Sequence, residues 1–276
     1  MAPMPGTNLT RDEAATRAAL LDVTSYTIDL DLTTGDTHFG SVTTLEFTCR
    51  EPGSSTFADL VDATVHEVSL NGRSVDPATA YSDSRIALDD LEATNTLMVK
   101  ADCRYTNTGE GLHRFVDPVD DRVYLYSQFE VPDARRVFTT FEQPDLKSVF
   151  TFNVTAPSHW KVVSNAATPE PRDLGDDRAV WNFPTTKRMS TYITAIVAGE
   201  YHAEFDTYLG KHGEIPLGFY CRQSLVEHLD TADLARTTKQ SFEFFEEQFD
   251  YPYPFGKYDQ LFVPEYNMGA MENAGC

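Results

Sequence analysis

The chain has 276 residues, with 22 Lys and Arg against 43 Asp and Glu, and a formal net charge of -21. This charge argues against binding to nucleic acids or anionic membranes, since both would repel the protein. Hydrophobic residues make up 41% of the chain, which suffices for a core, and the length predicts about two domains.

No stretch reaches the roughly 20 apolar residues of a membrane span, and residues 1–15 lack a secretion signal. The cysteines are too sparse for a disulfide framework and are interpreted as reduced thiols, namely Cys49, Cys103, Cys221 and Cys276. We therefore expect a cytoplasmic protein that contacts no membrane.

Strand patterns dominate most of the chain. A capping box from Thr10 to Glu13 predicts a short helix first, and apolar and polar residues then alternate. The dipeptide Asn71-Gly72 is a two-residue hairpin signal. We expect strands near 26–32, 45–49, 97–103, 123–129, 150–154, 160–163, 179–183 and 192–197. The sequence thus predicts a mostly β fold, with an N-terminal antiparallel β-sandwich domain over residues 1–207.

The pattern changes after residue 207. One more strand is expected over 215–221, followed by a helix over 231–249 whose apolar residues recur every three or four positions. Two Tyr-Pro pairs end this helix, and a short strand over 260–263 follows. These few elements cannot close a core, so residues 208–276 are predicted to be the incomplete start of a second domain. The helix should therefore leave an apolar face uncovered.

The stretch that carries chemistry is residues 267–273, N-M-G-A-M-E-N. It sets Glu272 beside a Gly269-Ala270 backbone, along which an extended peptide could lie as an added strand. A polar turn with a solvated Glu272 fits the same residues. Gln128-Phe129-Glu130 closes a predicted strand, and its plain interpretation is a strand end in water. Residues 135–144 are best interpreted as a buried turn with charge-paired arginines.

Residues 269–273 spell G-A-M-E-N, which resembles the exopeptidase signature of the zinc aminopeptidases related to aminopeptidase N. Residues 128–130 match the Q-x-E strand end of that family. Residues 135–144 resemble its R-R-x-F-P-C-F-D-E-P turn, with Thr139-Thr140 in place of Pro-Cys and Glu142-Gln143 in place of Asp-Glu. The resemblance, closest to high-GC bacterial enzymes, implies that residues 208–276 begin a thermolysin-like α+β catalytic domain.

This resemblance implies a substrate-binding set, namely Gln128, Glu130, Met268, Gly269, Ala270, Met271, Glu272 and Asn273. Glu130 and Glu272 would converge on the α-ammonium group of a peptide with a free N-terminus. Gln128 would line the pocket for the first side chain, Met268 would cushion that side chain, and Gly269-Ala270 would bind the substrate backbone. A monomer is expected.

The family's chemistry implies a zinc ion on an H-E-x-x-H helix with a further glutamate ligand. No two histidines here are four residues apart; they are His38, His66, His113, His159, His202, His212 and His228. We therefore expect zinc in a longer parent protein, with ligands beyond residue 276. That parent would remove N-terminal amino acids through zinc-activated water. The chain alone is expected to hold no metal and no catalytic residue, and to be inactive.

Two other functions are considered. A non-catalytic peptide-binding or scaffold member of the same family is one alternative, although a scaffold has no physical need for the pair Glu130 and Glu272. A glycoside hydrolase on a β-sandwich, with these two residues as acid and base, is the other, but it gives G-A-M-E-N no role. A metal-independent protease is poorly supported, because no G-x-S-x-G elbow is present.

Overall fold

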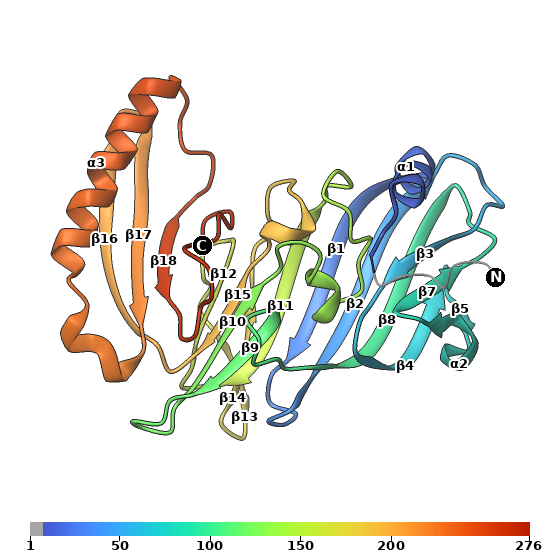
Figure 1. Ribbon diagram of the computed structural model, residues 1–276, viewed down its shortest axis with the longest axis horizontal. Coiled ribbons are helices and arrows are strands. Elements are labelled where there is room, and N and C mark those ends of the chain that lie inside the picture. Colours follow the sequence, from blue (N-terminus) through green and yellow to red (C-terminus); the bar gives the residue numbers. More distant parts are fainter. Residues whose placement is uncertain (1–7) are drawn as a thin grey trace.

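The computed structural model describes residues 8–276 and consists mostly of β-strands, as predicted (Figure 1). The first element is α1 (Arg11–Leu20). The Thr10 hydroxyl accepts a hydrogen bond from the Glu13 N–H at 3.2 Å, and the Glu13 carboxylate accepts one from the Thr10 N–H at 2.8 Å. This confirms the predicted capping box. The prediction that residues 1–15 carry no secretion signal falls partly on residues 1–7, which lie outside the described residues.

The largest sheet has eight strands in the order β13-β14-β11-β1-β2-β8-β4-β5. They are β1 (Leu21–Asp31), β2 (His38–Cys49), β4 (Ala63–Leu70), β5 (Arg73–Val75), β8 (Thr94–Arg104), β11 (Val149–Pro157), β13 (Arg172–Gly175) and β14 (Arg178–Asn182). Neighbours are antiparallel except β1 and β11, which run parallel with Tyr26 opposite Phe150. The predicted antiparallel sheet thus contains one parallel pair, which local sequence could not reveal.

A four-stranded sheet packs against the large one in the order β12-β15-β10-β9. Its strands are β9 (Gly111–Val116), β10 (Val123–Gln128), β12 (Lys161–Ser164) and β15 (Ile196–Gly199). Leu112 and Leu125 of this sheet belong to the same buried apolar cluster as Phe150 and Phe152 of the large sheet. The two sheets therefore enclose one sandwich core.

Smaller elements lie beside the sandwich. A three-stranded sheet comprises β3 (Thr56–Asp59), β6 (Tyr81–Ser82) and β7 (Arg85–Leu88), next to α2 (Pro77–Ala80). Short 3-10 helices are η1 (Ala134–Arg136), η2 (Thr191–Ile193) and η3 (Gln223–His228). The strand predicted over 192–197 is wrong except at 196 and 197, which lie in β15, since 192 and 193 belong to η2. There the Thr194 N–H and hydroxyl both donate to the Thr191 carbonyl, at 3.1 and 2.7 Å, and so close a turn.

The C-terminal region forms a separate layer at the left of Figure 1. The strands β16 (His202–Gly210), β17 (Gly213–Cys221) and β18 (Tyr258–Phe262) form a three-stranded sheet. The helix α3 (Thr231–Phe249) covers one face of it, with the predicted bounds. The predicted domain boundary after residue 207 falls inside β16, and the boundary itself stays a prediction.

Residues 137–143 are buried against the sandwich, and the interpretation as a buried turn with a charge-paired arginine is confirmed for Arg136. Arg136 pairs with Asp133 at 2.6 Å and with Glu110 at 3.3 Å. The Glu142 carboxylate accepts the Arg135 N–H at 2.8 Å and the Thr191 hydroxyl at 2.6 Å. The turn thereby fixes the chain that follows Glu130.

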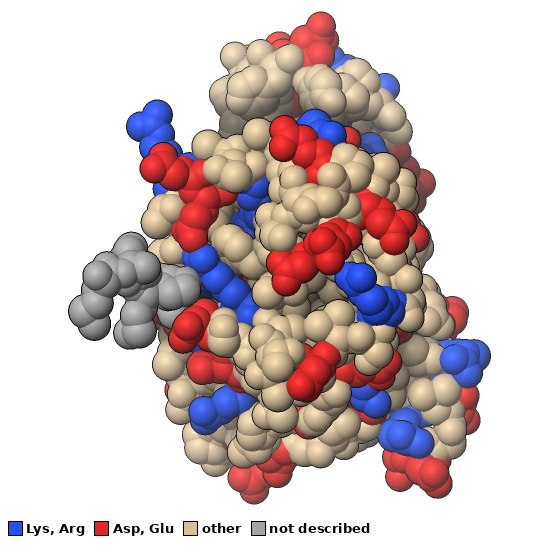
Figure 2. Space-filling view, turned by 90° about the vertical axis from the view of Figure 1, so that its right-hand side faces the viewer, with Lys and Arg blue, Asp and Glu red and all other residues tan. Residues whose placement is uncertain are grey.

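None of the helices described within residues 8–276 is long and apolar enough to cross a membrane. All four cysteines are free, as expected. On the face seen in Figure 2, blue Lys and Arg side chains lie among red Asp and Glu side chains instead of gathering into a basic patch.

Candidate functional site

The first motif lies at the end of β10, inside the four-stranded sheet. Gln128 pairs with Gly111 of β9 and is buried, with 5% of its surface exposed. The next residue, Phe129, is also buried and packs edge-on against Phe138 at 6.0 Å between ring centroids. Glu130 is exposed, and its N–H donates to the Gln128 side-chain oxygen at 2.6 Å. The strand end therefore presents a carboxylate on a rigid base.

The second motif lies in residues 263–276, an irregular segment that follows β18. Its far end is held firmly. The Asn165 amide donates to the Ala274 carbonyl at 2.9 Å, and the Lys257 ammonium donates to the Gly275 carbonyl at 2.9 Å. Gly275 has φ +76, and a Cβ there would lie 2.7 Å from the Asn165 carbonyl oxygen, so only glycine fits. The C-terminal end of this segment is thus held in place by side chains of Asn165 and Lys257.

The two motifs meet, although 140 residues separate them in sequence. The Gln128 side-chain nitrogen lies 3.6 Å from the Met268 sulfur. Two residues before Gln128, the Tyr126 ring contacts the Tyr266 ring edge-on at 5.6 Å, and the Tyr126 hydroxyl donates to the Glu265 carbonyl at 3.4 Å. The strand β10 therefore supports the segment that carries Met268.

The negative charges of Glu130 and Glu272 both raise the pKa of one hydroxyl group, that of Tyr266. The pKa of Tyr266 is raised, first by burial and then by the negative charges of Glu130 and Glu272. That phenol oxygen is buried and has no hydrogen-bond partner within residues 8–276. Neither carboxylate makes an ion pair or a side-chain hydrogen bond with any described residue, and both are exposed. Two uncompensated negative charges therefore lie around Tyr266.

The remaining predicted residues lie beside Glu272 in sequence. Gly269 and Ala270 are exposed, and a Cβ on Gly269 would meet open space. Among the described residues, the backbone groups of 269–272 make no backbone hydrogen bond. The Asn273 carbonyl accepts the Cys276 N–H at 3.4 Å, whereas Met271 is half-buried. No hydrogen bond or ion pair joins either Met271 or Asn273 to the end of β10 in the described chain.

Sequence reasoning missed the aromatic and imidazole residues that support the site. Tyr126 was counted only as part of a strand, and Tyr266 was not singled out. His113 was considered only as a lone histidine, yet it stacks on Tyr126 at 4.8 Å and contacts Glu265. The available signal was Glu265-Tyr266 immediately before the motif, but nothing local tied it to β9.

A metal ion has no ready ligand set in residues 8–276. No group of three or more His, Cys, Asp or Glu side chains there is arranged to hold one. The residues of this part of the chain therefore do not fit the zinc ion that the resemblance implies.

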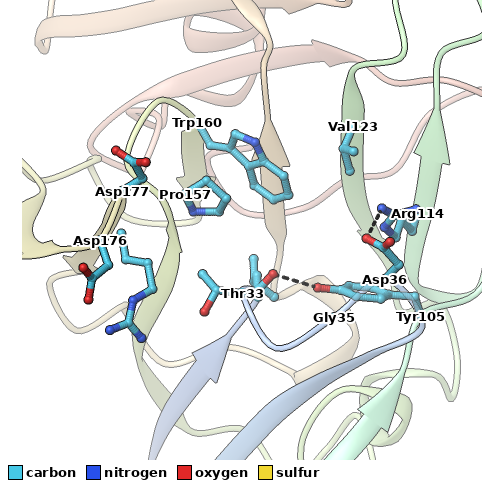
Figure 3. A pocket seen from close by; sticks show the side chains of 12 residues that line it. Thr33, Gly35, Asp36, Tyr105, Arg114, Val123, Pro157, Trp160, Asp176 and Asp177 are labelled. Carbon is cyan, nitrogen blue, oxygen red and sulfur yellow. Dashed lines mark hydrogen bonds and ion pairs between the residues drawn. The ribbon is translucent and has the colours of Figure 1, made fainter.

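Two hollows lie away from the motifs. One, of about 490 Å³, is lined by Trp160 and Pro157 opposite the ion pair of Asp36 with Arg114, whose atoms approach to 2.6 Å (Figure 3). The other, of about 680 Å³, lies between the end of α3 and residues 251–254. Neither is lined by Gln128, Glu130 or residues 265–273.

Comparisons with known proteins match two parts of this chain. The profile of the Peptidase M1 N-terminal domain matches residues 23–193, and that of the Peptidase family M1 domain matches residues 234–276. An aminopeptidase N of Streptomyces lividans is 59% identical over 277 residues, which cover 99% of this chain and 32% of the relative.

More distant relatives also align with parts of this chain. Aminopeptidase 2 of Candida albicans is 26% identical over 84% of this chain and 25% of its own length. Human aminopeptidase N is 33% identical over 56% of this chain and 16% of its own length. The chain belongs to peptidase family M1 and resembles bacterial aminopeptidase N, and it spans a third or less of the length of these curated relatives.

Proposed function

We propose that this chain supplies the substrate-anchoring part of a zinc-dependent aminopeptidase that removes N-terminal amino acids from peptides. The observation that carries the proposal is the pair of exposed carboxylates without an ion-pair partner in residues 8–276, Glu130 and Glu272, whose negative charges both raise the pKa of Tyr266. A free α-ammonium group is the cation that fits between them.

Charge explains why such a site would select a free N-terminus. Each charge-assisted hydrogen bond from an ammonium group to Glu130 or Glu272 contributes about 1.5–3 kcal/mol. A blocked N-terminus carries no charge and would leave both carboxylates desolvated without a partner, which is costly. The site therefore favours exopeptidase over endopeptidase substrates.

The backbone of 269–272 would bind the peptide as an added strand. Its N–H and C=O groups have no backbone partner in the described chain, and Gly269 faces open space. An extended peptide satisfies such groups with main-chain hydrogen bonds. Gln128 and Met268, in contact with each other, would border the first side chain, with Ala270, Met271 and Asn273 completing the set.

Zinc belongs to the proposal for a longer protein, because its ligands are not among residues 8–276. We therefore derive no catalytic step through the metal. When bound, the metal would supply a hydroxide nucleophile near neutral pH. We propose that the 276-residue chain alone hydrolyses nothing, and that the protein is a cytoplasmic monomer whose partners are peptides with a free N-terminus.

Peptide binding tests the anchoring role directly. Calorimetric titration of the chain with trialanine should give a dissociation constant at least about tenfold lower than with N-acetyl-trialanine. Glu130→Gln and Glu272→Gln should each weaken binding of the free peptide by about 10- to 100-fold, and Glu170→Gln, which removes an exposed charge elsewhere, should not. Equal binding of the two peptides contradicts the proposal.

A chimera tests the enzymatic role. In the Streptomyces lividans aminopeptidase N, this chain would replace the matching segment, with which it is 59% identical. We expect chelator-sensitive hydrolysis of an alanine arylamide by the chimera and none by the isolated chain. Hydrolysis by the isolated chain, or an inactive but folded chimera, argues against the assignment.

A further inference from the structure

His113 lies at the junction between β9 and the segment that carries the second motif. Its side chain is buried, with 1% exposed, and its ring stacks on Tyr126 at 4.8 Å with an interplanar angle of 22°. It comes from the sandwich, whereas its partner Glu265 directly precedes the site segment. The contact therefore joins two regions that are 152 residues apart in sequence.

The hydrogen bonds around His113 specify one tautomer. The Gly109 N–H donates to Nδ1 at 3.0 Å, so Nδ1 must carry a lone pair. The proton of the neutral ring is then on Nε2, which donates to the Glu265 carboxylate at 3.1 Å. Burial lowers the pKa of His113, against the opposing effect of Glu265, and so favours this neutral form.

Further contacts hold the same segment. The Tyr126 hydroxyl donates to the Glu265 carbonyl at 3.4 Å, and Glu265 has a left-handed backbone with φ +53. The Asn267 amide donates to the Thr108 carbonyl at 3.2 Å. A Cβ on Gly109, whose φ is +80, would lie 2.9 Å from the Asn267 side chain. Residues 265–267 are therefore pressed closely against the sandwich, directly before Met268.

We propose that His113 is a positioning residue, which acts through Glu265 to set the segment 265–273 against the end of β10 and so fixes where Glu272 lies relative to Glu130. This inference rests on the proposed function for its effect on peptide binding. The geometric part, the placement of Met268 against Gln128, stands on the contacts alone.

Two substitutions test the two hydrogen bonds of the His113 ring separately. His113→Asn places an amide oxygen near the Nδ1 position, so it keeps an acceptor for the Gly109 N–H and loses the donor to Glu265. His113→Gln reaches the Nε2 position and keeps a donor to Glu265, while losing the acceptor for Gly109. His66→Asn is the matched control, because His66 also pairs with a carboxylate, Asp102 at 2.8 Å, but on the exposed face of β4.

The binding experiment uses the full chain and trialanine. We expect His113→Asn to weaken binding by about tenfold, with a thermal midpoint close to that of the unsubstituted chain, and His113→Gln to bind within about threefold of it. Glu265→Gln should lie close to the unsubstituted chain, since its amide oxygen still accepts from Nε2. Wild-type affinity in His113→Asn, or a tenfold loss in His66→Asn as well, overturns the inference.

Nuclear magnetic resonance decides the geometric part without any peptide. The imidazole ¹⁵N spectrum should show a protonated Nε2 and an unprotonated Nδ1, and the Met268 methyl group should give a cross-peak to the Gln128 side-chain amide that His113→Asn abolishes. A protonated Nδ1, or an unchanged cross-peak, overturns the inference. If the unsubstituted chain does not distinguish free from acetylated peptide, the proposed function fails, while this cross-peak still decides the role of His113.

Discussion

Phenylalanine has opposite environments in two regions of the molecule. In the large sheet, Phe150 and Phe152 are 0% and 1% exposed. On α3, Phe245 and Phe249 are 52% and 73% exposed, and their rings stack on each other at 5.8 Å in contact with solvent. The same residue type, at comparably regular spacing, is core in one region and surface in the other.

The difference lies in the number of layers. The large sheet has the four-stranded sheet packed against it, so its inner face is enclosed. The helix α3 has only the three-stranded sheet of β16, β17 and β18 beneath it, and its buried residues are Ala235 and Glu246. The C-terminal half of α3 also borders the open hollow of about 680 Å³. Periodicity therefore identifies an apolar face, but a second layer determines whether that face is buried.

Removing a ring from the enclosed region should have the largest effect. Phe150 stacks on Tyr26 at 4.8 Å in a fully buried site, so Phe150→Ala leaves a cavity. We expect a loss of about 3–5 kcal/mol in the free energy of unfolding, measured by urea titration. A loss below about 1 kcal/mol would mean that the two layers do not enclose this site.

A buried carboxyl group in the enclosed region should make the free energy of unfolding depend on pH. Burial raises the pKa of Glu142 to about 7, above its ordinary value of 4.5. Between these values the folded state holds a proton that the unfolded chain has lost, so stability falls as pH rises through this window and is level above it. We expect a total fall of about 3 kcal/mol.

Urea titrations between about pH 5 and 8 measure how the free energy of unfolding changes with pH, and this range covers the shifted pKa of Glu142. Glu142→Gln should reduce this slope, whereas Glu170→Gln, at an exposed position, should leave it unchanged. An identical slope in Glu142→Gln and in the unsubstituted chain argues against the raised pKa.

Removing the N-cap of α1 or of α3 should have an intermediate effect on stability and should show whether the two regions unfold together. The Thr10 hydroxyl caps α1, and the Asp230 carboxylate caps α3 by accepting the Asp233 N–H at 3.1 Å. Thr10→Ala and Asp230→Ala should each cost about 1 kcal/mol. The first should appear in global unfolding, because Arg17 of α1 is buried and pairs with Asp59 at 2.7 Å. The second should appear mainly as faster amide exchange within α3. Equal effects on global unfolding contradict the contrast.

The smallest effect is expected on the open face of α3. Phe249→Ser removes an apolar ring that is 73% exposed, so we expect a change within about 0.5 kcal/mol. Urea titration measures the stability, and light scattering should register less self-association. A loss as large as that of Phe150→Ala would show that this face is covered in solution.

Local signals in the sequence predicted local structure well. The helix bounds at 231 and 249 are confirmed, and Asn71 and Gly72 form the expected turn, with φ of 54 and 75. The parallel pairing of β1 with β11 was not predictable, since it joins segments whose contact depends on the whole sandwich. The roles of His113 and Tyr126 beside the candidate site were not predicted for the same reason.

The motifs that define the candidate site were visible because each is a short run of residues. What they could not specify is the surroundings of the two carboxylates. Tyr266 precedes the G-A-M-E-N run by three positions, yet the burial that raises its pKa, alongside the charges of Glu130 and Glu272, depends on its contact with Tyr126 of β10. The mutual placement of Glu130 and Glu272 as amine ligands stays a prediction.

The loop that carries the second motif is tied down beside Asn165, which donates to the carbonyls of both Ile193 and Ala274 at 2.9 Å. A loop fixed in this way before any peptide arrives has little disorder left to lose on association. Under the proposed function, peptide binding should then proceed without a slow rearrangement, so that peptides of different affinity have similar association rates and differ mainly in their dissociation rates.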